Sequence, residues 1–148
     1  METVLSIIAI IISVISGGFA LYTFFWTAKR DRKQATLDAY NRLQNEALDN
    51  INLYSSQRIA GIIENPRSEE FKKLGAYIAR IEHFCVGVNK EIYDKEIVYE
   101  LAHGYFDGGL RKRIEPIINR KNINGHDFYE NIHKVYAWMD EKTGKDEK

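Results

Sequence analysis

The 148-residue sequence contains one cysteine, Cys85, and two prolines, and it has no charged residue at all between Val4 and Trp26. A single cysteine excludes an intrachain disulfide, which fits a reducing cytoplasm, and its apolar neighbours favour a small core residue over a nucleophile. Lys and Arg together equal Asp and Glu in number, so no global field attracts nucleic acid or an acidic partner. No stretch alternates as a strand does, and the sequence therefore predicts an all-α fold.

Motifs for catalysis and for phosphate binding are also absent from the sequence. The four histidines have no spacing that would bring two of them onto one helical turn beside a carboxylate, as zinc hydrolysis requires. The glycine-rich segment at residues 104–109 lacks the Lys-Ser/Thr pair of a phosphate-binding loop. We therefore expect a protein that is not an enzyme and that uses no metal or cofactor.

The uncharged segment, residues 4–26, is the most informative part of the chain. At 1.5 Å per helical residue it is about 35 Å long, enough to cross a hydrocarbon core of about 30 Å with some tilt. A secretory signal peptide would have a basic start and a shorter apolar core, whereas this chain begins Met1-Glu2-Thr3 and places its cations after the apolar run. The segment predicts one transmembrane helix.

Charged residues that follow the span predict its orientation. Four cations come directly after it: Lys29, Arg30, Arg32 and Lys33. Positively charged flanks stay on the cytoplasmic side of a membrane. We therefore expect a single-pass protein with its amino terminus outside and residues 29–148 in the cytoplasm.

Small and polar side chains recur along the span at alternating steps of three and four residues, which places them on one face of a helix. With Glu2 at one end, this stripe consists of Glu2, Ser6, Ala9, Ser13, Ser16, Ala20, Thr23 and Thr27. Lipid is as apolar as leucine, so a lone helix gains nothing by placing these residues on one face. A helix that packs against copies of itself does gain, because the small and polar face can form the contact. The stripe therefore predicts a homo-oligomer.

Two interpretations of the stripe stay open. In the first, small residues let neighbouring helices pack closely, and the hydroxyls bond back to the helix or across to a partner. In the second, about four such helices, a tetramer, surround a water-filled path that the hydroxyls line. The pair Gly17-Gly18 adds a predicted hinge in the middle of the helix.

Residues 27–60 predict a juxtamembrane helical stalk, because no proline or glycine interrupts them. The three-four rhythm continues at Leu37, Tyr40, Gln44, Ala47, Ile51 and Tyr54. This face either extends the self-association of the span or packs on the chain's own domain as an ordinary amphipathic helix.

Residues 61–148 are expected to form a cytoplasmic helical domain, since they supply enough apolar side chains for a core. Gly61 and Pro66 are expected to break the preceding helix. Ser68 is expected to cap the next helix and Asp94 the one after it. The first of these two helices would bury one face, with Phe71, Leu74, Ile78, Ile81, Cys85 and Val88.

Three glycines are then expected to loosen the chain: Gly104, Gly108 and Gly109. A short helix is predicted over residues 110–121, with Pro116 marking a restart or kink, and a turn over residues 122–125. The last predicted helix covers residues 127–142, and its packing positions are Phe128, Ile132, Val135, Tyr136 and Met139.

The best candidate for ligand binding is a basic cluster formed by Arg111, Lys112, Arg113, Arg120 and Lys121. Such cations hold phosphates by charge-assisted hydrogen bonds, and Tyr105 or Phe106 would be near enough to stack a base. The competing interpretation is a solvated helix face, or ion pairs with a neighbouring subunit. The cluster therefore predicts an anion or nucleotide site on the one interpretation and no site on the other.

The segment at residues 80–101, RIEHFCVGVNKEIYDKEIVYEL, resembles a bacterial family of unknown function whose members have one amino-terminal span and a helical cytoplasmic domain. The likeness rests on Glu82, Phe84, Gly87, Asn89, Ile92, Tyr93 and Asp94, and it extends over residues 70–140. The layout is also similar to the membrane effectors of Hailong-type anti-phage systems, which a nucleotidyltransferase product controls. These resemblances imply a bacterial inner-membrane protein with a nucleotide or oligonucleotide ligand and a partner enzyme.

Two functional classes follow from these observations. In the first, the protein is a homo-oligomeric membrane effector, a ligand-gated ion channel of anti-phage defence whose cytoplasmic domain senses a nucleotide or nucleic-acid signal. In the second, the span is only an anchor in the lipid bilayer, and the helical domain binds a partner protein as a scaffold or regulator.

Overall fold

The computed structural model describes residues 1–120 and 127–146, and this part of the chain contains helices and no strand. The elements in chain order are α1 (Glu2–Leu43), the π-helix η1 (Gln44–Leu48), α2 (Asp49–Asn52), α3 (Ser56–Glu64), α4 (Glu69–Asn89), α5 (Lys95–Tyr105), the π-helix η2 (Phe106–Leu110), α6 (Arg111–Ile118) and α7 (Glu130–Asp146). The predicted all-α fold is confirmed.

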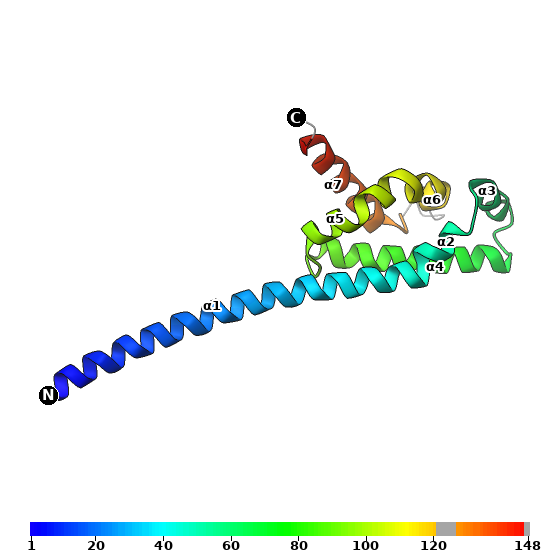
Figure 1. The fold of residues 1–148 in the computed structure, drawn as a ribbon. Helices are drawn as coiled ribbons and strands as arrows, with labels where there is room; N and C mark the ends of the chain where they lie inside the picture. The colour runs from blue at the N-terminus through cyan, green and yellow to red at the C-terminus, as the bar shows by residue number, and fades with distance from the viewer. Residues whose placement is uncertain (121–126, 147–148) are drawn as a thin grey trace.

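The first half of α1 projects away from the rest of the protein, while its second half lies beside α4 (Figure 1). The later helices pack together with that second half, and we call this packed region, from Thr36 onward, the helical body. Within it α7 packs on α4, and α5 packs on α1. One long helix is therefore shared between an isolated segment and a packed core.

The core of the helical body contains apolar side chains from α1 to α7. On α1, η1 and α2 these are Tyr40, Leu43, Ala47, Leu48 and Ile51. This face of the predicted stalk thus packs on the chain's own domain, which is the second of the two alternatives. Gln44 was expected on the same face but is exposed, because the π-turn at η1 shifts the helical register and buries Leu48 instead.

Both predicted helix caps are present in the structure. Ser68 Oγ accepts a hydrogen bond from the Phe71 N–H at 3.1 Å and so caps α4. Asp94 Oδ1 accepts the N–H groups of Glu96 and Ile97 at 3.1 and 3.3 Å and so caps α5. The predicted apolar face of α4 is buried from Leu74 to Val88, and Phe71 is half-buried at its start.

The first continuous helical segment, α1 to α2, ends earlier than the sequence predicts. The run ends at Asn52, and Ser55 Oγ accepts the Arg58 N–H at 3.2 Å, which starts α3. The prediction that Gly61 breaks the helix was therefore wrong, because this glycine lies inside α3. Glycine costs a helix only about 1 kcal/mol, so a capped segment that buries apolar side chains accommodates it.

Two further expectations need correction. The glycines expected to loosen the chain lie within helices: Gly104 in α5, and Gly108 and Gly109 in η2. The last helix starts at Glu130 rather than at residue 127, and Phe128, which precedes it, is 60% exposed instead of packed. The predicted turn at residues 122–125 lies outside the described residues.

Candidate membrane span and the pocket at its base

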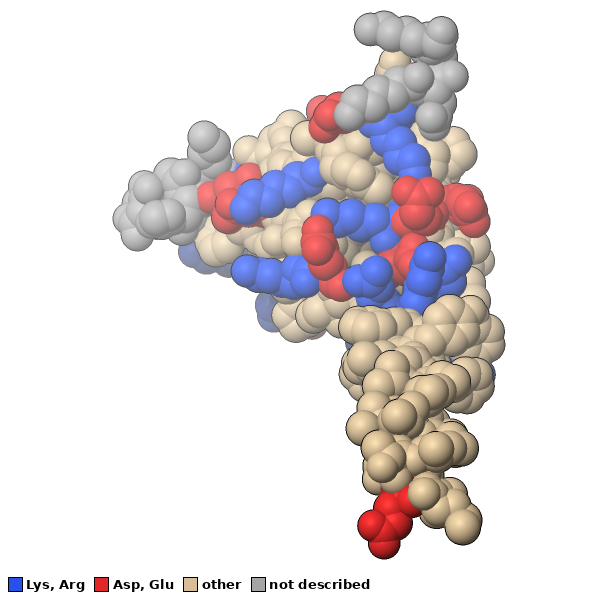
Figure 2. All heavy atoms as spheres, turned by 90° about the vertical axis from the view of Figure 1, so that its left-hand side faces the viewer, with Lys and Arg blue, Asp and Glu red and all other residues tan. Residues whose placement is uncertain are grey.

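The projecting half of α1 is long and apolar enough to cross a membrane, and none of its apolar segment is buried in the protein. Large apolar side chains such as Ile10 and Phe19 are more than 60% exposed on it. Figure 2 shows this segment as a projection that is uncharged except for an acidic side chain at its tip, below a body that carries both cations and anions. Apolar surface this extensive needs an apolar environment. The segment is a candidate single membrane span.

Because α1 is one uninterrupted helix, the predicted stripe from Ser6 to Thr27 lies along one face of it. Ser6 Oγ donates to the Glu2 carbonyl oxygen at 3.0 Å, and Thr23 Oγ1 donates to that of Phe19 at 2.8 Å. These bonds occupy the hydroxyl protons and leave oxygen lone pairs on the outer surface of the helix. Such a face suits close helix packing and a water-filled path alike.

The predicted hinge residues, Gly17 and Gly18, are helical and lie in the middle of the projecting segment. A methyl group added at either residue would meet no atom within 4 Å. Neither glycine is therefore required by packing within one chain, and their role as a hinge stays a prediction.

Thr36 fastens α1 to the helical body at the base of the span. Its side chain is fully buried, its Oγ1 donates to the Arg32 carbonyl oxygen at 2.7 Å, and the same oxygen accepts the Asp94 N–H at 2.8 Å. One turn further on, Tyr40 Oη donates to the Leu101 carbonyl oxygen at 3.2 Å. These hydrogen bonds attach α1, just below the candidate span, to the start and middle of α5.

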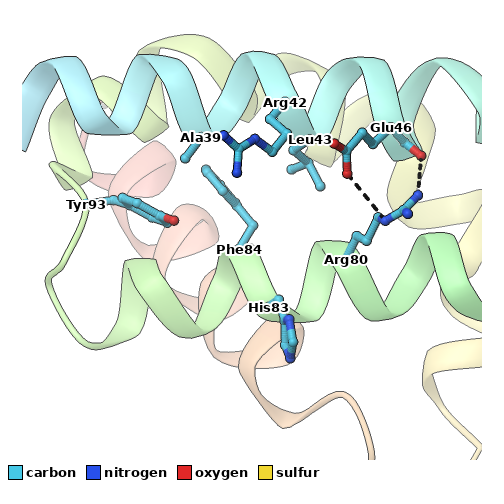
Figure 3. Close-up of a pocket in the computed structure, with 8 residues that line it drawn as sticks. All are labelled: Ala39, Arg42, Leu43, Glu46, Arg80, His83, Phe84 and Tyr93. Carbon is cyan, nitrogen blue, oxygen red and sulfur yellow. Dashed lines mark hydrogen bonds and ion pairs between the residues drawn. The ribbon is translucent and has the colours of Figure 1, made fainter.

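A pocket of about 260 Å³ lies between α1 and α4, just beyond this attachment (Figure 3). Its lining residues are Ala39, Arg42, Leu43, Glu46, Arg80, His83, Phe84 and Tyr93. Arg80 bridges the two helices, since its Nη1 donates to the Glu46 carbonyl oxygen at 3.0 Å and its Nε lies 3.5 Å from Glu46 Oε2. Within the described residues Arg42 makes no hydrogen bond or ion pair, so its guanidinium group is available to a ligand.

Two stacked rings form one wall of the pocket. The Phe84 and Tyr93 rings lie 5.2 Å apart at an angle of 22°. Tyr93 fits there because residue 87 is a glycine, since a Cβ at this position would lie 2.6 Å from Tyr93 Cδ2. Together with Arg42 and Arg80, the wall offers cationic donors beside an aromatic face. A small anion with a planar ring matches this chemistry.

Glu82 and Asn89, which carry part of the resemblance, hold α7 in place rather than lining the pocket. Glu82 Oε1 and Oε2 accept the N–H groups of Asn131 and Ile132 at 3.1 and 3.0 Å, at the start of α7. Asn89 Nδ2 donates to the Asn131 carbonyl oxygen at 3.1 Å. A carboxylate at a helix amino terminus is stabilising, so these residues fix α7 on α4.

The predicted basic cluster does not converge on one point. Arg111 Nη1 donates to Asp140 Oδ1 at 2.8 Å, and Arg113 Nη1 donates to Asn52 Oδ1 at 2.9 Å. The Arg120 guanidinium lies over the Phe71 ring, 5.7 Å from its centre. Lys112 is exposed, and Lys121 lies outside the described residues. Three of these cations therefore contact three different parts of the body, and their role in binding an anion stays a prediction.

The residues of the pocket were not predicted as a site. Arg42 and Glu46 have the four-residue spacing of a helical pair, but the third charge, Arg80, comes from another helix. Nothing in the sequence pairs α1 with α4. The pocket is visible only once the two helices are placed side by side.

Fold and span together define an all-α protein with one candidate membrane-spanning helix continuous with a helical body. The chain belongs to the family described as "Domain of unknown function (DUF4760)", which matches residues 10–138. The match therefore includes most of the apolar segment, from residue 10 onward, as well as nearly all of the body. No curated protein and no solved structure is found to match the chain.

Proposed function

We propose that the protein is a homo-oligomeric membrane effector in which the projecting half of α1 forms a ligand-gated, ion-conducting pore. The observation that carries this proposal is the continuity of α1, which is the span at one end and a wall of the pocket at the other. A ligand that moves α4 relative to α1 would act directly on the span. The polar stripe supplies the face that copies of the chain would turn toward each other.

The signal that such an effector senses would bind in the pocket between α1 and α4. The available Arg42 guanidinium and the aromatic wall favour a phosphate-bearing ligand with a planar base, in keeping with a nucleotide or short oligonucleotide, while Arg80 stays paired with Glu46. Ligand sites of this kind are concave and lie between helices. The basic cluster at α6 is the competing site.

The setting of this function is the bacterial inner membrane, with the amino terminus outside and the helical body in the cytoplasm. The four cations after the span support this orientation. The layout is that of a membrane effector in anti-phage defence, in which a partner enzyme would make the signal. We assign the protein no catalytic step of its own.

Ion flux through liposomes that contain the purified protein tests the pore, with and without candidate nucleotides. Ser13→Leu adds bulk on the polar stripe and should abolish the flux, while the mass of the oligomer in detergent stays unchanged. Val14→Leu is the matched control, because it adds bulk on an adjacent position off the stripe and should leave the flux intact. A monomer in detergent, or equal flux in both variants, would refute the pore.

Binding measurements decide between the two candidate ligand sites. Arg42→Glu should weaken nucleotide binding at least tenfold, whereas Arg111→Glu with Arg113→Glu should leave it unchanged. The reverse result would assign the ligand to α6. A stable oligomer that neither conducts nor binds nucleotides under any condition would favour the anchored scaffold, whose body binds a partner protein.

A further inference from the structure

The turn between α4 and α5, residues 90–94, lies beside α1 immediately after the span. Arg32 Nη1 donates to the Glu91 carbonyl oxygen at 3.4 Å, and Thr36 holds the Asp94 N–H. In Figure 1 this turn is at the end of α4 from which α1 leaves the body. The turn is thus the part of the body next to the apolar segment.

The depth of this turn follows from the geometry of α1. Arg32 comes six residues after Trp26, which corresponds to about 9 Å along a helix. The polar region on each side of a bilayer is about 5–8 Å thick, because the core is about 30 Å and the whole bilayer about 40–45 Å. If Trp26 marks the edge of the core, the turn lies at the outer edge of the headgroup region, within reach of long side chains to the lipid phosphates.

The surface at this level carries both cations and carboxylates. A pocket of about 350 Å³ is formed there by Lys29 and Arg32 of α1 together with Glu91, Tyr93, Asp94, Lys95 and Glu96. Figure 2 looks onto this side of the body and shows the charged side chains gathered around the base of the uncharged projection.

The acidic groups of this pocket are already engaged. Lys95 Nζ lies 3.4 Å from Glu91 Oε1, and Lys142 Nζ lies 3.2 Å from Glu96 Oε1. The Asp94 carboxylate is buried and caps α5. Lys29 and Lys90, by contrast, are exposed and have no acidic partner among the described residues, so the pocket and its rim are left with cations to offer.

An apolar side chain stands at the tip of the same turn. Ile92 is 60% exposed although it follows a tightly bonded helix end, where its N–H donates to the Gly87 carbonyl oxygen at 3.0 Å. Glu91 adopts the left-handed conformation, with φ 57°, that this helix end requires. The backbone therefore holds Ile92 in a fixed, outward position between Lys90 and Lys95.

We infer that this turn, together with Lys29 and Arg32, is a second membrane contact that binds the phosphates of anionic phospholipids. Ile92 enters the outer headgroup region, and the cations around it contact the lipid phosphates, as on amphipathic membrane-surface elements. The contact holds the body against the bilayer. This inference relies on the proposed membrane span and is independent of ion conduction.

The single cysteine makes a direct test practical. Cys85 is fully buried, and its burial raises the pKa of the thiol, so it reacts little in the folded protein. Ile92→Cys therefore introduces one accessible thiol for a fluorescent probe. Ile12→Cys, in the span, and Leu53→Cys, 77% exposed at the far end of the body, are the reference positions. Each full-length variant is reconstituted in phosphatidylcholine vesicles with or without phosphatidylglycerol.

Quenching by spin-labelled lipids gives the readout: lipids labelled near the headgroup report on residues 92 and 53, and lipids labelled within the acyl chain report on residue 12, which lies deep in the span. We expect the probe at residue 92 to be quenched several-fold more strongly than the probe at residue 53, and most strongly in the anionic vesicles. Lys29→Glu with Lys90→Glu should abolish the anionic enhancement, whereas Lys73→Glu with Lys112→Glu, two exposed lysines distant from the turn, should not.

Three results would overturn the inference. Equal quenching at residues 92 and 53, with strong quenching at residue 12, would support the membrane span and refute the second membrane contact. Equal quenching at residue 92 in neutral and anionic vesicles would contradict the binding of anionic phospholipids. No quenching at residue 12 would refute the membrane span, and the second membrane contact would be refuted with it.

Discussion

Gly87→Ala tests the packing that forms the aromatic wall of the pocket. The new methyl group would lie 2.6 Å from Tyr93 Cδ2, so the Tyr93 ring must leave α4 and its stack on Phe84. Overpacking costs about 1–3 kcal/mol and a lost aromatic pair about 0.5–1.5 kcal/mol, while alanine returns about 0.5–1 kcal/mol of helix propensity. Together these contributions give a net loss of about 2 kcal/mol, within a range of about 0.5–4 kcal/mol.

Thermal unfolding in detergent, followed by circular dichroism, measures this loss. A destabilisation of that size should lower the Tm by about 3–8 °C. Gly75→Ala is the matched control in the same helix, because a methyl group there meets no atom within 4 Å. Its only effect should be improved helix propensity, so its Tm should rise by about 1–3 °C.

A double-mutant cycle shows whether the ring is the cause. In a Tyr93→Ala background the clash is gone, and Gly87→Ala should become neutral or slightly stabilising. Two results would contradict this reasoning. One is a Gly87→Ala variant as stable as the wild type, and the other is an equal loss of stability from Gly87→Ala in the Tyr93→Ala background. Either would mean that the Tyr93 ring does not depend on the close approach to Gly87.

Two further predictions concern stability. Glu82→Gln replaces a carboxylate oxygen that accepts bonds from Asn131 with an amide donor, and we expect a loss of about 1–3 kcal/mol in thermal unfolding, against less than about 0.5 kcal/mol for the exposed control Glu100→Gln. Burial, with a smaller contribution from Asp49, raises the pKa of Tyr40, so its contribution to stability is full below about pH 10 and is lost as the pH rises further. The Tm should therefore fall as the pH rises above about 10, and less steeply in Tyr40→Phe; an equal fall in both would refute this assignment.

Local signals in the sequence were the most reliable ones. The caps at Ser68 and Asp94 are set by side chains a few residues from the N–H groups that they accept, so the sequence alone predicts them. The end of the first helical run before Ser55 was not predicted, because no glycine or proline marks that position. Serine alone does not indicate a helix start, since it is recognised as a cap only where other signals already place one. Phe128 was misplaced because its helix starts two residues later, at Glu130.

The candidate site depends on contacts that no local pattern specifies. Arg42 and Arg80 line one pocket from two helices, and they do so because α1 packs on α4. The basic cluster shows the opposite case, since residues close in sequence diverge in space. Arg111 and Arg113 are two positions apart on a helix, which turns them about 200° from each other, and they contact α7 and α2 respectively.

The attachment of α1 at Thr36 makes the helix a lever with unequal arms. Ser13 lies 23 residues from this point, or about 35 Å along the axis, whereas Arg42 lies about 9 Å from it on the other side. A tilt of about 5° about Thr36 would move Arg42 by less than about 1 Å and Ser13 by about 3 Å. A change in the pocket no larger than a side-chain adjustment would thus be amplified to roughly the width of a water molecule within the bilayer.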